Sequence, residues 1–176
     1  MEPSSKKLGT SYGVYLGIAL ILISVLVYAF DVSLFTEWYM PVLQFLLIII
    51  MGVMAVNKAK KFSQSLFKFK DAFGVYFLTI FIGLLISIIF SYVLFNLVDP
   101  QAADIIKELT LEKQVEMFES LGLNEEQINE AITRVQEENN FSLKNLAIGF
   151  AIYLAVYSII GLIVALIFRE KEPAHS

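Results

Sequence analysis

The amino-acid sequence predicts an all-α polytopic membrane protein, with four transmembrane helices and an extracytoplasmic helical hairpin between helices 3 and 4. Three observations lead to this fold class. Four long blocks are apolar and uncharged, basic residues gather on alternate connections between them, and one long connection is acidic with apolar residues at helical spacing. The chain is only 17% charged, whereas soluble domains average about 25%.

The four apolar blocks are residues 12–30, 38–56, 73–98 and 146–168, which are 19, 19, 26 and 23 residues long. At about 1.5 Å per residue, helices of these lengths reach across a hydrocarbon core about 30 Å thick. A soluble helix of the same length would carry a polar stripe, and these blocks carry none. Because hydrocarbon offers the backbone no hydrogen-bond partner, each block is expected to form a continuous helix.

The segments between the blocks differ in charge. The N-terminal tail (1–11), the loop 57–72 and the C-terminal tail (169–176) together hold nine basic and four acidic residues. The short loop 31–37 and the long segment 99–145 hold four basic and thirteen acidic residues. Because basic residues are retained on the cytoplasmic side, we expect both termini in the cytoplasm and the acidic connections outside.

The basic loop 57–72 allows two interpretations. Its lysines fit simple topogenic charge beside a membrane. Phe62, Leu66, Phe69 and Phe73 also recur at helical spacing, which is typical of a short amphipathic helix lying in the headgroup layer. Nucleic-acid binding is not expected, because membrane orientation already accounts for the lysines.

The acidic segment 99–145 has eleven acidic and four basic residues, a local charge of −7. Asp99 is expected to cap a helix that begins near Gln101 and ends at Gly122. Asn124 and Gln127 form the pattern of a capping box for a second helix. So short a segment rarely forms a stable core alone, so its apolar faces should rest on each other, on the spans or on a second copy of the chain.

Small residues at a spacing of four mark where helices can approach closely. A strip of glycines at the start of the first span can dock another span of the same chain or form a dimer. We favour docking within the chain, because a four-span protein makes many internal contacts. Two shorter pairs lie in the third and fourth spans. The predicted helix-packing residues are Gly9, Gly13 and Gly17, then Ser87 and Ser91, and finally Gly161 and Ala165.

Residues that carry chemistry are scarce. The chain has no cysteine, which excludes disulfides, thiol catalysis and thiolate metal sites. Its single histidine, His175, is in the C-terminal tail, and no acidic or basic side chain occurs within the four blocks. We therefore predict no catalytic, cofactor-binding or metal-binding residue. Gln44 and Asn96, near the outer ends of their spans, are expected to cap helix ends or to hydrogen-bond between helices.

The layout resembles a known family. The features that support the resemblance are the run FKDAF at 69–73, the run LVDP at 97–100 where the third span ends, the acidic helical insert, and the run GLIVALI at 161–167 before a charged tail. Together they are similar to the small bacterial membrane proteins described as domain of unknown function 4199. The resemblance covers roughly residues 8 to 171. It implies a bacterial inner-membrane location and brings no activity.

Two functions remain open. The first is a non-enzymatic membrane protein that contacts a membrane-protein partner or a second copy of itself through its outward helical segment. The alternative is a small oligomeric transporter or channel for a neutral or lipophilic solute. It draws on the polar line Gln44, Thr79, Ser87 and Ser91, and on a short echo between residues 13–15 and 74–76. The lipid bilayer is a partner in both cases.

Overall fold

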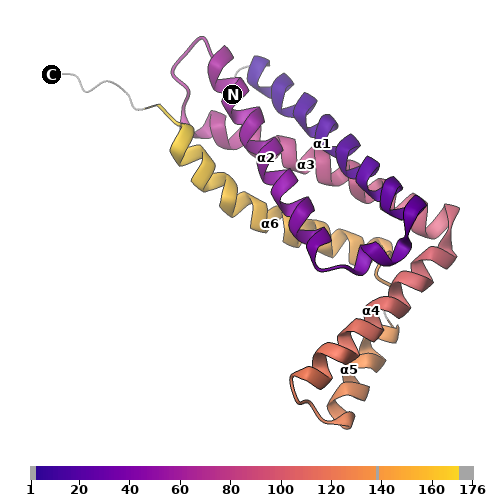
Figure 1. The fold of residues 1–176 in the computed structure, drawn as a ribbon. Coiled ribbons are helices and arrows are strands. Elements are labelled where there is room, and N and C mark those ends of the chain that lie inside the picture. The colour runs from indigo at the N-terminus through magenta and orange to yellow at the C-terminus, as the bar shows by residue number, and fades with distance from the viewer. Residues whose placement is uncertain (1–2, 138, 171–176) are drawn as a thin grey trace.

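The computed structural model describes residues 3–137 and 139–170, and this part of the chain is built from helices (Figure 1). In chain order they are α1 (Pro3–Phe30), a short 3-10 helix η1 (Val32–Thr36), α2 (Tyr39–Phe62), α3 (Phe69–Val93), a π-helical turn η2 (Leu94–Val98), α4 (Pro100–Ser120), α5 (Glu125–Glu137) and α6 (Leu143–Phe168). Four helices, α1, α2, α3 with η2, and α6, are long and apolar enough to cross a membrane. The predicted all-α fold with four spans is confirmed.

Helix α3 is the hub of the bundle. It packs against α1, α2 and α6, whereas the described residues of α1 and α6 make no contact with each other. The start of α1 and the end of α6 lie at the same end of the bundle, and α4 and α5 project from the other end (Figure 1). We call the latter the lobe end, and α4 with α5 the lobe.

Glycines bring α1 and α3 together. A Cβ atom placed on Gly13 would lie 2.7 Å from Cβ of Ile82, and one on Gly17 would lie 2.8 Å from Cβ of Ile86. Gly83 of α3 gives the reciprocal contact, because its Cβ would lie 2.5 Å from a methyl carbon of Leu16. The glycine strip therefore docks on a helix of the same chain, at a separation that no larger residue permits.

Tyr76 of α3 joins the other two helices. Its side chain is fully buried, with Gly52 of α2 on one side of the ring and Gly161 of α6 on the other. A Cβ atom on either glycine would lie 2.6 Å from a ring carbon. In the described part of the chain the Tyr76 hydroxyl has no hydrogen-bond partner. The ring thus fills the space between three helices, in the half of the bundle away from the lobe.

The loop between α2 and α3 does not form a separate amphipathic helix. Phe62 ends α2, Phe69 begins α3, and residues 63–68 are not helical. Instead, Phe67 is buried and pairs with Glu170 beyond the end of α6. The Phe67 N–H donates to Oε2 of Glu170 (2.9 Å), and the Glu170 N–H donates to the Phe67 carbonyl (2.9 Å). The loop is therefore fixed to the end of α6 by contacts that its own spacing does not reveal.

The start of the lobe follows the local signals in the sequence. The Asp99 carboxylate accepts from the Ala102 N–H (3.1 Å) and caps α4. Gly122 ends the following turn with a φ of 73°. Asn124 and Gln127 exchange the two capping-box bonds, at 2.9 and 3.2 Å. These three predictions are confirmed.

Replacing Gly13 by alanine tests the contact between α1 and α3. We expect Gly13→Ala to lower the free energy of unfolding by about 1–3 kcal/mol, because the added methyl meets Ile82 and the Thr79 carbonyl and forces two backbones apart. Denaturant titration in detergent micelles measures this. Gly149→Ala is the matched control, since nothing lies within 4 Å of its added Cβ. Equal stability of the two variants would contradict the close docking.

Candidate functional site

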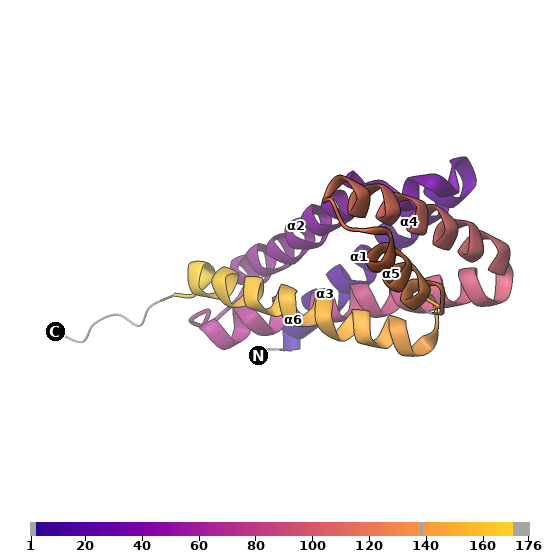
Figure 2. The same ribbon diagram turned by 90° about the horizontal axis from the view of Figure 1, so that it is seen from below.

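A cavity of about 570 Å³ lies between α2 and α6 at the lobe end of the bundle. We call it the cleft. It exists because α2 and α6 both pack on α3 but diverge from each other toward the lobe (Figure 2). Its volume is within the range of small-molecule sites, roughly 300–1,000 Å³. The lining residues are Phe35, Met40, Pro41, Val42, Gln44, Phe45, Ile48, Leu84, Ile106, Phe141, Tyr153 and Tyr157.

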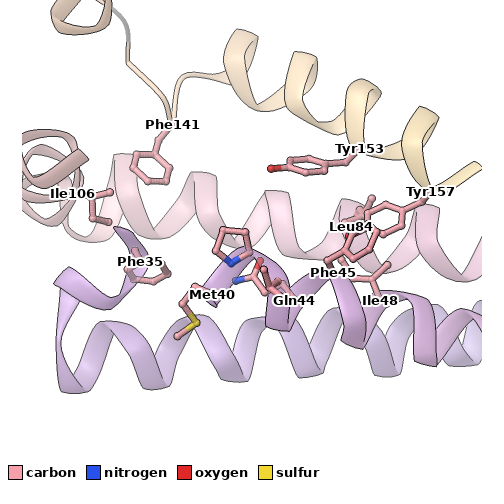
Figure 3. Close-up of a pocket in the computed structure, with 12 residues that line it drawn as sticks. Phe35, Met40, Gln44, Phe45, Ile48, Leu84, Ile106, Phe141, Tyr153 and Tyr157 are labelled. Atoms are coloured by element: carbon pink, nitrogen blue, oxygen red, sulfur yellow. The ribbon is translucent and has the colours of Figure 1, made fainter. Parts of the chain in front are cut away.

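Large, mainly apolar side chains line both ends of the cleft (Figure 3). Phe35, Ile106 and Phe141 line the end toward the lobe. At the other end the rings of Phe45 and Tyr157 stack with their centres 5.5 Å apart. No lining residue is charged, so the site favours an uncharged occupant.

Two polar side chains enter the cleft between its ends. Gln44 extends from α2 and Tyr153 from α6, so they reach the cavity from opposite walls (Figure 3). Together they offer an amide N–H₂ and a phenol O–H to an occupant. Gln44 was expected to cap a helix end or to bond another helix, but the structure places it in the cavity wall. Asn96 does bond outside its own helix, because its amide donates to the Phe141 carbonyl (2.9 Å).

The depth of the cleft matches about half of a bilayer. The stretch of α2 from Tyr39, where the helix begins, to Ile48, at the deep end, is about 14 Å long. Half of a hydrocarbon core is about 15 Å. The walls flank faces that a bilayer would cover, since Val42 and Tyr153 are about half exposed. In a membrane, the cleft therefore opens sideways onto hydrocarbon.

The lobe is the second candidate site. Among the described residues, α5 contacts α4 and no other helix. Figure 1 shows α4 projecting from the end of the bundle and α5 lying beside its far part. Asp104, Glu108, Glu112 and Glu116 recur at every fourth position of α4 and are all exposed. Like charges at this spacing repel one another by a few tenths of a kcal/mol per pair. A cationic partner would relieve that repulsion.

Two polar contacts attach the lobe to the bundle. The Tyr28 hydroxyl of α1 donates to Oδ2 of Asp99 (2.8 Å), and Nζ of Lys113 lies 2.6 Å from Oε1 of Glu37. The hydrogen bond from Tyr28, followed by that from the Ala102 N–H, holds the pKa of Asp99 below its ordinary value. The ionised form of Asp99 is therefore the one that attaches α4.

Comparison with known proteins identifies the family. Residues 11–170 match the family described as Protein of unknown function (DUF4199). The chain belongs to this family. The match confirms the resemblance seen in the sequence. No curated protein and no solved structure matches the chain.

In this DUF4199 protein, the predicted packing residues fall into two groups. Gly9, Gly13 and Gly17 face α3, while Gly161 touches Tyr76 and Ala165 is fully buried. Ser87 and Ser91 are half-buried on α3 and line neither the cleft nor the contact at Tyr76. His175 lies outside the described residues. Within them, no group of three histidine or acidic side chains is placed to hold a metal ion.

Sequence reasoning missed most of the cleft in the DUF4199 chain. Of its lining residues, only Gln44 was considered for a functional role, as part of a polar line. Tyr153 and Tyr157, one turn apart on α6, were the available signal, because tyrosine places a hydroxyl on an apolar helix face. Phe141 carried no such signal, since its place follows from the path of the chain between α5 and α6.

The Asp99 contact predicts a pH dependence. A depressed pKa in the folded state means that the contact stabilises the lobe above the ordinary pKa of aspartate, about 3.9, and that this stabilisation is lost as the pH falls through the lower folded value. At pH 6 we expect several-fold higher amide protection in α4 of the wild type than of Asp99→Asn.

Hydrogen exchange, normalised to intrinsic rates, measures the difference in α4 protection between the two proteins at a series of pH values from 6 to 2.5. It should shrink as the pH falls below about 4. A difference that stays constant over the whole range would contradict the assignment of the charged form.

Proposed function

We propose that this protein is a non-enzymatic, multi-pass protein of the bacterial inner membrane whose lobe binds a partner protein. The four apolar spans support the membrane location in general. The distribution of lysine and arginine supports placing both termini in the cytoplasm and the lobe outside. The absence of acidic and basic side chains from the four apolar blocks supports a role without chemistry inside the membrane.

The observation that carries the proposal is the isolation of the lobe. Helix α5 rests on α4 and on no other described helix. Beyond its first turns, α4 is attached to the bundle through the ion pair between Lys113 and Glu37. Met117 and Leu121, one turn apart near the end of α4, remain 50% and 67% exposed. Together with the acidic stripe, this exposed pair offers a partner both an apolar contact and a charged one.

The charge of the lobe favours one kind of partner. The exposed stripe from Asp104 to Glu116 would repel the same stripe on a second copy of the chain. A partner with a basic surface around an apolar recess would bind the stripe and the pair Met117 and Leu121 together. We therefore place a different protein, rather than a second copy, at the lobe.

A transporter or channel for a neutral or lipophilic solute is the second candidate, and the cleft is the observation that favours it. The cleft occupies only the lobe half of the bundle. In the other half Tyr76 fills the space between α2, α3 and α6. A solute crossing the membrane through one chain would have to displace that ring, so binding is better supported than passage.

The partner proposal predicts a charge-dependent crosslink. With a photoreactive amino acid at Leu121, irradiation of native membranes should give one discrete adduct larger than the chain. Reversing two charges of the stripe (Glu112→Lys with Glu116→Lys) should lower its yield at least fivefold, because opposite charges attract across an interface. The neutral pair Glu112→Gln with Glu116→Gln should give an intermediate yield.

The matched control places the photoreactive residue at Gln64, which is exposed in the loop at the opposite end of the bundle. This position should not give the same adduct. A crosslink yield that is unchanged by the charge reversal would refute a partner with a basic surface. An adduct with the mass of two chains would replace the partner by a second copy.

A further inference from the structure

The cleft between α2 and α6 is a separate site from the lobe surface described above. We propose that it binds one uncharged, carbonyl-bearing lipid, drawn sideways from the surrounding bilayer between α2 and α6. The proposal rests on the lining of the cleft, its access and its two polar groups. It does not depend on whether the lobe binds a protein.

Access determines the source of the ligand. Large side chains stand at both ends of the cleft: Phe35, Ile106 and Phe141 toward the lobe, and Phe45, Ile48 and Tyr157 at the deep end (Figure 3). The remaining approach lies between α2 and α6, whose outer faces are apolar. There, Val42, Tyr153 and Val156 are each 43–58% exposed, in a region that a bilayer covers. A molecule that enters by this route comes from the membrane.

The lining determines the charge of the ligand. None of the twelve lining residues is charged, and moving an unpaired charge into such a site is strongly unfavourable. Phe35, Ile106 and Phe141, which line the end toward the lobe, also offer a charged headgroup no polar partner. A lipid with a small, uncharged polar end meets neither obstacle.

The two polar groups determine where the ligand is held. No described residue hydrogen-bonds to the Gln44 amide or to the Tyr153 hydroxyl. Leaving such groups unpaired in hydrocarbon is unfavourable. An ester carbonyl has two lone pairs and can accept from both donors, which reach the cavity from opposite walls (Figure 3).

The dimensions suit a lipid of one leaflet. The cleft holds about 570 Å³, and its depth of about 14 Å along α2 is close to half of a hydrocarbon core. An acyl chain anchored by its ester at Gln44 and Tyr153 would reach Ile48 and Leu84 at the deep end. These side chains are 4% and 8% exposed, so lipid on the outer surface of the bundle barely reaches them.

Photolabelling of the full-length protein tests the proposal. The protein is reconstituted in phosphatidylcholine vesicles that contain a diacylglycerol with a diazirine in its acyl chain, and adducts are mapped by mass spectrometry. We expect adducts at Ile48 and Leu84, in addition to surface adducts at positions such as Ile89, which is 55% exposed. Adducts at surface positions alone would overturn the proposal.

Competition identifies the chemical class. Excess unlabelled diacylglycerol should lower the yield of the adducts at Ile48 and Leu84 at least fivefold, and should leave the yield at Ile89 unchanged. The same excess of phosphatidylglycerol, which carries a charged headgroup, should not compete. Equal competition by both lipids would overturn the requirement for an uncharged ligand.

Two variants test the place and the polar contact. Val42→Trp fills the mouth of the cleft and should lower the deep adducts at least fivefold. Leu46→Trp, one turn along α2 with almost the same exposure (51% against 49%) but outside the lining, should not. Gln44→Leu should weaken competition by diacylglycerol at least fivefold. Unchanged labelling in Val42→Trp would overturn the site, and unchanged competition in Gln44→Leu would overturn the carbonyl contact.

Discussion

The hydrocarbon around the four long helices governs how they can pack on one another. Large apolar side chains face outward all along them, including Leu22, Ile89 and Ile163, each more than half exposed. Hydrocarbon solvates such surfaces but gives helices no hydrophobic reason to associate. Contact between spans therefore relies on close approach, which the glycines of α1, α2, α3 and α6 permit. Where glycines oppose a large side chain, the helices touch.

The cleft follows from the same rule. Gly52 and Gly161 clamp Tyr76 and hold α2 and α6 near α3 in the half of the bundle away from the lobe. No comparable pair of described glycines brings α2 and α6 together nearer the lobe, where Gly149 of α6 meets nothing within 4 Å. The two helices diverge there, and aromatic side chains line the space between them. The positions of the glycines thus account both for the close packing around Tyr76 and for the cleft in the half of the bundle nearer the lobe.

Local signals predicted much of this fold, and long-range pairings escaped them. The spans, the Asp99 cap, the Gly122 stop and the box at Asn124 depend on neighbouring residues, so the sequence shows them directly. The spacing of Gly9, Gly13 and Gly17 indicated a docking face but not that α3 covers it. The bond from Tyr28 to Asp99 joins residues 71 positions apart. The cleft depends on where α2 and α6 diverge from each other, and no local pattern in the sequence predicts that.

Four helices that cross a bilayer put the lobe and the lysine-rich loop on opposite sides of it. The chain has no cysteine, so single cysteines can report on each side. A membrane-impermeant maleimide applied to spheroplasts should label Leu121→Cys on the lobe at once, and Gln64→Cys in the loop only after permeabilisation. Immediate labelling of both would contradict the membrane-spanning arrangement, and the reverse pattern would contradict its orientation.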